Sequence, residues 1–323
     1  FKIKDYYRVL FHEITKENIV DSLKNGLYID NNRTNSQKAR RVIDRIIGYP
    51  ISSAIRDKFK KENVVTDEEL KSFGIGRVTA AAINILVQNE RRIQQFIPKK
   101  FKKIYISYIH EGLQFSVNNG MKFYEEHYEE LGFLHTMTTN PEIDHVVEKY
   151  KQDTRDAAPY PPLITSRILR NLNYLYHYET KKTEAILQKL FEGVEIYNEK
   201  EQKMERVGLI TYHRTDSFNI SEKAIDEIRE CLSERFGKDY IADSKRVFKN
   251  KNKNAQEAHE AIRPTSFRKE FFPKNLRKTL SKEQFSDEEY LTYEFIFYRT
   301  LSTQMKNSIY DNSKLVINVG GNK

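Results

Sequence analysis

Residues 208–217 have the sequence GLITYHRTDS, in which a tyrosine, an arginine and an aspartate occupy alternate positions. If residues 209–215 are extended, side chains two positions apart share a face, so Tyr212 and Arg214 point the same way. A phenol titrates near ~10, so only about one in a thousand is ionised at neutral pH. A guanidinium that cannot lose its charge favours the phenolate and binds a phosphate. The pair therefore indicates a tyrosine that attacks phosphorus; the alternative is a β-strand with a tyrosine on its half-solvated face.

The elements that must position this stretch are predicted from hydrophobic spacing. Residues 30–98 have helical spacing, and their first helix has an apolar inner face and ends at Gly48. That face consists of Ala39, Val42, Ile43, Ile46 and Ile47. Strict alternation in 103–109 and 113–117 predicts a β-hairpin, while 120–150 return to a helix-like, acidic spacing.

A linker with three prolines near its end is expected over 153–162, and residues 163–305 are predicted to be mostly helical. Two short helices precede the tyrosine strand at 207–215, and this order resembles a winged-helix module. The spacing around Cys231 makes it a core residue of a later helix. A last strand is predicted over 313–319 and could return to the sheet of the hairpin.

Length and composition limit the classes of protein to which the chain can belong. A chain of 323 residues suggests two or three domains rather than one core. The net charge of +9 fits a polyanionic partner, although a lysine-rich solvated surface gives the same balance. Its single cysteine excludes an internal disulfide and a Cys-based zinc site. No apolar run approaches the ~20 residues of a membrane span and no signal peptide opens the chain, so we expect a cytoplasmic protein with no membrane partner.

A second stretch, AQEAHEAIRPT at 255–265, adds a histidine at His259. With the tyrosine stretch it resembles the type IA DNA topoisomerases, in which the Y-x-R-T-D-S strand holds the nucleophilic tyrosine and the A-H-E-A-I-R-P-T run supplies an active-site histidine. Three more stretches match in the same order: RVLFHEIT at 8–15, SQKARRVIDRIIGY at 36–49 and PYPPLITS at 159–166. His213 fits reverse gyrases and some bacterial members, so bacterial topoisomerase I and the topoisomerase module of reverse gyrase both stay open.

The resemblance implies a fold that is mainly α with a β-rich arch: a multidomain gate of helical and winged-helix-like domains plus an antiparallel β arch. It implies the following division. Residues 1–29 are the tail of a toprim domain, 30–98 a helical domain that binds single strands, 99–158 the first part of the arch, 159–305 the winged-helix-like domain with the tyrosine, and 306–323 the truncated second part of the arch.

The same resemblance implies a transesterification on single-stranded and negatively supercoiled DNA. Tyr212 would form a 5′-phosphotyrosyl bond and leave a 3′-hydroxyl, which later reverses the step after another strand has passed. Arg214 would stabilise charge on the phosphate; the alternative is a salt bridge with Asp216. His259 would bind the scissile phosphate or help move a proton to the leaving oxygen; the alternative is a surface histidine.

A wider set of DNA-binding residues is implied as well: Arg8, Arg40, Arg41, Asp44, Tyr49, Arg77, Asp216 and Arg263. For Asp44 the alternative is a pair with Arg40 or Arg41 within one helix. Arg77 begins a helix similar to the family's S-A-G-R-V-Q, with Thr79 in the glutamine position. For Arg263, binding a phosphate and capping a helix end before Pro264 are left equal.

The family's toprim domain should precede Arg8 with a glutamate, a lysine and a D-x-D-x-x-[GE] cluster for Mg²⁺, and these residues contain none of it. We therefore expect a fragment whose Mg²⁺ is bound by a toprim domain in cis or in trans, with no metal or zinc site of its own. Such a chain would be inactive or impaired alone. The alternative function is a non-catalytic module that binds single-stranded DNA with the same basic surface.

Overall fold

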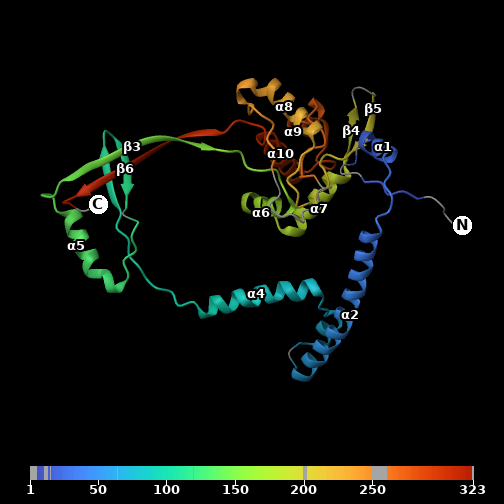
Figure 1. Cartoon of the computed structure of the whole chain (residues 1–323), viewed down its shortest axis with the longest axis horizontal. Coiled ribbons are helices and arrows are strands. Elements are labelled where there is room, and N and C mark those ends of the chain that lie inside the picture. Colours follow the sequence, from blue (N-terminus) through green and yellow to red (C-terminus); the bar gives the residue numbers. More distant parts are fainter. Residues whose placement is uncertain are drawn as a thin grey trace. The chain divides into compact units, whose positions relative to one another are not determined.

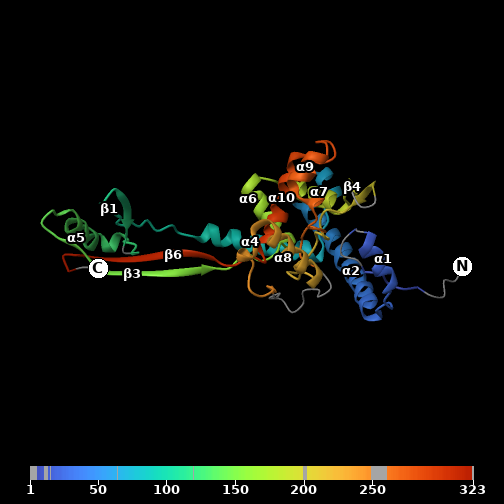
Figure 2. The ribbon, with the colours of Figure 1, turned by 90° about the horizontal axis from the view of Figure 1, so that it is seen from above.

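The computed structural model describes residues 6–10, 14, 16–63, 65–118, 120–198, 202–248 and 260–321. The chain divides into two compact units. We call Phe1–Tyr28 with Asp153–Asn312 the tyrosine unit, and Ile29–Gln152 with Ser313–Lys323 the hairpin unit. The border falls inside two paired strands, β3 (His145–Ala157) and β6 (Ser308–Val319), which lie side by side (Figures 1 and 2).

Helices dominate the tyrosine unit (Figure 1). They are α1 (Lys16–Lys24), α6 (Thr165–Tyr176), α7 (Thr180–Glu192), α8 (Glu222–Phe236), α9 (Pro273–Thr279) and α10 (Asp287–Ser302). A hairpin of β4 (Val194–Asn198) and β5 (Lys203–Val207) follows α7, which gives the predicted order of two helices and a strand-bearing segment. Gly193 ends α7 with φ of 90°, and a Cβ there would lie 2.2 Å from the Val207 carbonyl oxygen, so only glycine fits this corner.

The core of this unit is built from the apolar faces that the spacing predicts. Leu172 of α6, Leu187 of α7, Ile228 of α8 and Phe297 of α10 are all fully buried and belong to one cluster. Burial of each such side chain contributes about 1.5–3 kcal/mol. Cys231 is 3% exposed, which confirms the prediction that it is a core residue.

The hairpin unit consists of more loosely packed elements. They are α2 (Asn31–Glu62), α3 (Asp67–Ser72), α4 (Arg77–Gln95), β1 (Ile106–His110), β2 (Leu113–Val117) and α5 (Tyr128–Thr139). The predicted hairpin is confirmed, with Tyr108 opposite Phe115 in its antiparallel register. No helix within the described ranges has an apolar stretch long enough to cross a membrane.

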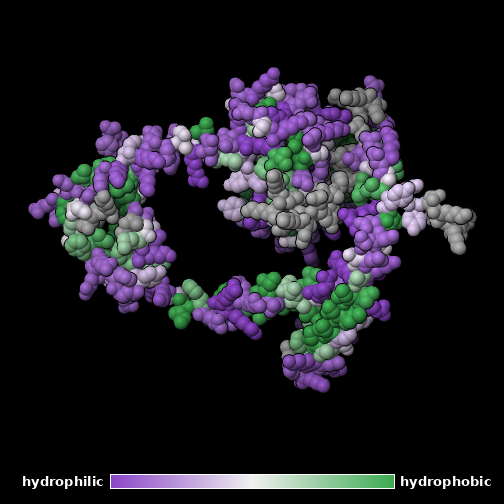
Figure 3. Space-filling view, in the orientation of Figure 1, coloured by the Kyte–Doolittle hydropathy of each residue, from purple (hydrophilic) through white to green (hydrophobic). Residues whose placement is uncertain are grey.

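The first helix of this unit differs from the prediction in two ways. It does not end at Gly48 but continues through Pro50 to Glu62. Its second half is held by hydrogen bonds that local spacing cannot reveal, including the bond from the Ser52 hydroxyl to the Ile75 carbonyl at 3.1 Å. The predicted inner face is also wrong, because Val42 and Ile46 are 56% and 64% exposed, and hydrophobic residues colour the surface over α2 (Figure 3).

Two strand predictions also need correction. Residues 145–157 form β3, so the helix-like reading fails over 145–150 and the linker reading fails up to Ala157. Charged residues lie on both faces of β3, so its sequence lacks the alternation that predicts a strand. Its pairing partner lies some 160 residues later in the chain, so neighbouring residues do not indicate the pairing. The last strand pairs with β3 rather than with the hairpin, so the described residues contain three separate two-stranded sheets.

Candidate active site

The predicted tyrosine strand is extended, but it is not a strand of a sheet. Beyond Val207 at the end of β5, its only ladder contact within the described chain is one isolated bridge between Ile210 and Pro264. Burial nevertheless alternates as expected. The inward side chains are Thr211, His213, Thr215 and Ser217, and the outward ones are Tyr212, Arg214 and Asp216. The prediction of a shared face for Tyr212 and Arg214 therefore agrees with the burial pattern, although sheet pairing does not produce it.

Two threonine hydroxyls hold this segment in place of a sheet. The Thr211 hydroxyl donates to the Ala261 carbonyl at 2.7 Å and accepts from the Arg263 amide at 3.0 Å. Thr165, the first residue of α6, donates its hydroxyl proton to the His213 carbonyl at 2.6 Å and accepts from the Thr215 amide at 2.9 Å. The backbone is thus fixed on both sides of Tyr212 and Arg214.

Sequence reasoning missed this role of the threonines. It gave no individual role to Thr165 or to Thr211. The available signal was a threonine directly before the tyrosine and another in the PYPPLITS stretch, since buried hydroxyls need partners.

Tyr212 is half-buried beside two rings. Its ring centroid lies 5.3 Å from that of Phe191 on α7 and 5.6 Å from that of His213. His213 is 1% exposed, and neither ring nitrogen has a hydrogen-bond partner in the described part of the chain. Burial, followed by the charge of Arg214, lowers the pKa of His213 below 6.5, so the imidazole is neutral at neutral pH.

Arg214 is exposed on the same side as the phenol. It forms no ion pair with Asp216 or with any other acid of the described residues, so the alternative of a structural salt bridge is not formed. A guanidinium without a carboxylate partner keeps its donors available for an incoming anion.

Arg263, by contrast, is buried and its donors are occupied. Its Nε donates to Glu260 at 2.9 Å and its Nη1 to the Pro264 carbonyl at 2.8 Å. The other oxygen of Glu260 accepts from the amide of Ser221, the N-cap of α8, at 2.7 Å. No helix ends before Pro264 in the described residues, so Arg263 does not cap one there, and phosphate binding by Arg263 stays a prediction. His259 lies outside the described residues.

Arg8 belongs to the same unit. Its backbone pairs with Leu27 through two hydrogen bonds of 2.7 and 2.8 Å, and its side chain is half-exposed. The remaining predicted residues lie in the hairpin unit, so the sequence-predicted set is divided between the two units.

The group in the hairpin unit centres on Asp44. Its carboxylate accepts from Arg77 Nε at 2.9 Å and lies 3.7 Å from Arg40 Nε. The hydrogen bond from Arg77 is the main reason that the pKa of Asp44 is lowered. The pairing with Arg40 was the predicted alternative for Asp44, and the stronger partner comes from another helix. Arg40, Arg77 and Ile43 line a shallow hollow of about 420 Å³.

An exposed aromatic side chain lies one turn further along α2. Tyr49 is 72% exposed, and the Arg45 guanidinium lies 5.5 Å from its ring centroid. Arg41 is exposed on the same helix. Sequence reasoning missed Arg45, although its position four residues before Tyr49 was a usable signal.

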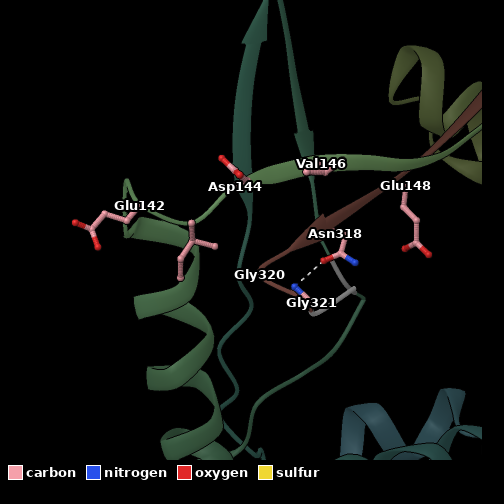
Figure 4. Close-up of a pocket in the computed structure, with 8 residues that line it drawn as sticks. Glu142, Asp144, Val146, Glu148, Asn318, Gly320 and Gly321 are labelled. Carbon is pink, nitrogen blue, oxygen red and sulfur yellow. Dashed lines mark hydrogen bonds between the residues drawn. The ribbon is translucent and has the colours of Figure 1, made fainter.

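Another hollow, of about 500 Å³, lies between the start of β3 and the end of β6 (Figure 4). Glu142, Asp144 and Glu148 line it, but their carboxylates diverge in Figure 4. No group of three His, Cys, Asp or Glu side chains among the described residues could hold a metal ion. The side chains of the described residues therefore do not fit a magnesium site.

Known proteins are similar to this chain in sequence and in fold. A family model described as DNA topoisomerase matches residues 28–323. DNA topoisomerase 1 of Helicobacter pylori is 33% identical over 319 residues, covering 98% of this chain and 40% of the relative. DNA topoisomerase 1 of Thermotoga maritima is 34% identical over 312 residues, covering 96% and 44%. The chain thus spans less than half the length of these relatives.

A solved structure gives the same result for the fold. Full-length topoisomerase I from Thermotoga maritima matches with a TM-score of 0.70 and 29% identity, over 98% of this chain and 46% of that one. The match confirms the expected class, mainly α with antiparallel sheets. From the family match over nearly all of its length, we conclude that the chain belongs to the type IA DNA topoisomerases.

Proposed function

We propose that this chain is the tyrosine-bearing part of a topoisomerase that cleaves one DNA strand, passes another strand and reseals the break. One observation carries the proposal. A half-buried phenol at Tyr212 shares the outward side of a fixed segment with Arg214, whose guanidinium has no acidic partner among the described residues. Family membership makes nucleic-acid phosphate the chemically consistent anion for this pair.

In the proposed reaction, the phenolic oxygen of Tyr212 attacks a backbone phosphorus. The P–O bond to the 3′ oxygen breaks, the phenolic proton leaves, and the leaving oxygen takes up a proton, with His259 as the proposed donor or phosphate ligand. A 5′-phosphotyrosyl ester and a free 3′-hydroxyl result. Because a phenoxide is a fair leaving group, the 3′-hydroxyl reverses the step without external energy.

Arg214 is proposed to stabilise the charge that the phosphate carries as it transfers. The neutral His213 assists only by packing against the tyrosine ring at 5.6 Å between centroids. A protonated neighbour at that position would add a second charge beside Arg214, and burial opposes this.

The hairpin unit is proposed to carry the single-stranded DNA. Arg40, Arg41 and Arg77 supply exposed positive charge, and Tyr49 supplies an exposed ring on which a base can stack. Asp44 would orient Arg77 and Arg40 rather than touch the phosphate itself. Asp216 and Arg8 are proposed as lesser contacts in the tyrosine unit.

Type IA topoisomerases generally depend on Mg²⁺. We propose that a toprim domain, in cis or in trans, holds the ion, since the described residues contain no fitting cluster. The domain assignments stated from the sequence, 1–29, 30–98, 99–158, 159–305 and 306–323, remain part of this proposal, as does action on negatively supercoiled DNA at the nucleoid.

The test uses the complete protein with Mg²⁺ and a single-stranded oligonucleotide labelled at either end. A denaturing gel should show protein linked only to the fragment on the 5′-phosphate side, and Tyr212→Phe should abolish that product. A non-catalytic binding module would instead give equal binding by both proteins and no covalent product. Absence of the adduct in the wild type, or its persistence in Tyr212→Phe, would refute the proposal.

A further inference from the structure

Two arginines of the tyrosine unit lie outside the site described so far. Arg167 is in the first turn of α6, and its guanidinium carbon lies 4.8 Å from the centroid of the Phe218 ring. Arg299, near the end of α10, lies 4.9 Å from the Tyr160 ring and 5.3 Å from the Phe295 ring. Within the described part of the chain, neither side chain forms an ion pair or a hydrogen bond.

The surroundings of these arginines are electrostatically unfavourable. Arg299 is half-buried, and burial is the main cause that lowers its pKa, with the charge of Arg167 acting in the same direction. Two partly desolvated cations of like charge, with no acidic partner among the described residues, are electrostatically unfavourable. An anion placed between them would remove that penalty.

Other half-buried arginines of this unit bond to protein acceptors, as expected for arginines with a structural role. Arg246 donates to Asn307 at 2.6 Å and to the Met305 carbonyl at 3.1 Å. Arg277 pairs with Asp287. In contrast, the donors of Arg167 and Arg299 find no protein acceptor among the described residues, so their five-donor forks are available to a ligand.

The location of the pair connects it to the tyrosine segment. Phe218, under Arg167, directly follows the GLITYHRTDS stretch. Thr165, two residues before Arg167, holds the His213 carbonyl and the Thr215 amide. Tyr160 is 72% exposed, so its ring can also accept a base. Cations interleaved with aromatic rings are what a single nucleic-acid strand requires.

We propose that Arg167 and Arg299 form a second phosphate-binding site for the single DNA strand, with Tyr160 as a stacking surface beside it. The guanidinium forks bind the negatively charged oxygens of a backbone phosphate through paired N–H···O hydrogen bonds. This inference rests on the proposed function, because it deepens the account of the same substrate. The acidic hollow beside Glu142 and Glu148 is unsuited to such a strand because its carboxylates repel phosphate.

The experiment measures how the binding of a fluorescent oligo(dT) strand to the complete protein depends on salt. Removing one phosphate contact to a single strand reduces the slope of log K against log [salt] by about 0.7. The double variant Arg167→Gln/Arg299→Gln should therefore reduce the slope by about 1.4 and weaken binding several-fold at low salt. Arg299→Lys keeps the charge but removes the fork, so it should retain most of the slope.

Arg235→Gln is the matched control. Arg235 also stacks on a ring, 3.6 Å from the centroid of Phe272, but lies on α8 and has no arginine beside it in the interactions that the structure shows. Its slope should stay close to that of the wild type. An unchanged slope in the double variant, or an equal reduction in Arg235→Gln, overturns the proposal. Circular-dichroism melting identifies an unfolded double variant, in which case the single variants Arg167→Gln and Arg299→Gln decide. Each should reduce the slope by about 0.7, and an unchanged slope in both overturns the proposal.

The covalent assay separates this inference from the proposed function. If the wild type forms no adduct but the slope falls in the double variant, the transesterification proposal fails and the phosphate site stands. If the adduct forms through Tyr212 but the slope is unchanged in the double variant, the phosphate site alone fails.

Discussion

The tyrosine unit and the hairpin unit hold their proposed functional residues in different ways. In the first, the Tyr212 segment is fixed by hydroxyl-to-backbone hydrogen bonds beside a packed core that includes Leu209 and Ile210, both 0% exposed. In the second, Arg40, Asp44 and Arg77 meet on exposed helix surfaces. Removing one partner of a buried bond costs about 1–3 kcal/mol, whereas exposed ion pairs are screened by water and salt.

This difference suggests that the two units contribute to different steps of the proposed reaction. Bond making and breaking requires reacting atoms at fixed positions, and preorganised charge supplies a large share of such catalysis. Holding a flexible strand of varying sequence requires charge and ring surfaces that adapt. We therefore expect substitutions in the tyrosine unit to change rates, and substitutions in the hairpin unit to change binding modestly.

The largest effect is expected for Arg214→Gln. Removing a preorganised cation from the transferring phosphate should slow adduct formation by about 10²–10³-fold, while the affinity for DNA falls much less. Single-turnover quenched kinetics with a labelled oligonucleotide provide the measurement. Arg214→Lys keeps a point charge without the fork and should be intermediate. A rate within a factor of a few of the wild type for Arg214→Gln would show that the tyrosine does not depend on this cation.

A smaller effect is expected for Thr165→Val. The variant keeps the shape of the side chain but leaves the Thr215 amide and the His213 carbonyl without their hydroxyl partner, which destabilises folding by about 1–3 kcal/mol. Misplacement of Arg214 should also slow adduct formation, on the order of tenfold, at saturating DNA. Thr165→Ser retains the hydroxyl and should restore the rate. If Thr165→Ser is as slow as Thr165→Val, the hydroxyl is not what positions the pair.

His213 should make stability depend on pH. The folded pKa is lowered from 6.5, so the unfolded chain takes up a proton at a higher pH than the folded chain does. Stability should therefore fall as the pH drops through about 6.5 towards the folded pKa, and rise as the pH increases. His213→Met removes the titrating group, and urea midpoints at pH 7.5, 6.5 and 5.5 should show a weaker pH dependence. Equal dependence in both proteins would place the titration elsewhere.

The smallest effect is expected for Asp44→Asn. Its ion pairs with Arg40 and Arg77 are solvent-exposed, so thermal unfolding should change little. Removing a negative charge beside two arginines should leave the affinity for oligo(dT) equal to or slightly above that of the wild type. A clear drop in both quantities would show that the hairpin unit is as firmly organised as the tyrosine unit.

The features visible in the sequence are those with a local cause. The limits of α7 follow from apolar spacing and from Gly193, and the capping box of α3 follows from Thr66 and Glu69. The hairpin of β1 and β2 follows from strict alternation around Gly112. The outward alternation of Tyr212 and Arg214 was predictable for the same reason.

The features that escaped prediction depend on distant partners. Helix α2 continues past Gly48 and Pro50, where Ser52 bonds to the distant Ile75, and β3 pairs with the distant β6. The Thr165 bonds join residues about 50 positions apart. No periodicity within a short window encodes such contacts, so the site's supports could not be read from spacing.

The bonds of Thr165 also have a consequence for the resealing step of the proposed reaction. Thr165 begins α6 and is hydrogen-bonded to the backbone on both sides of Arg214, so these bonds join the helix to the segment that carries the phenol. A phosphate esterified to that phenol would keep its orientation for as long as the break persists. In the proposed reaction, the 3′-hydroxyl would then meet the same face of the phosphorus each time, which would favour faithful resealing over transfer to water or to a foreign end.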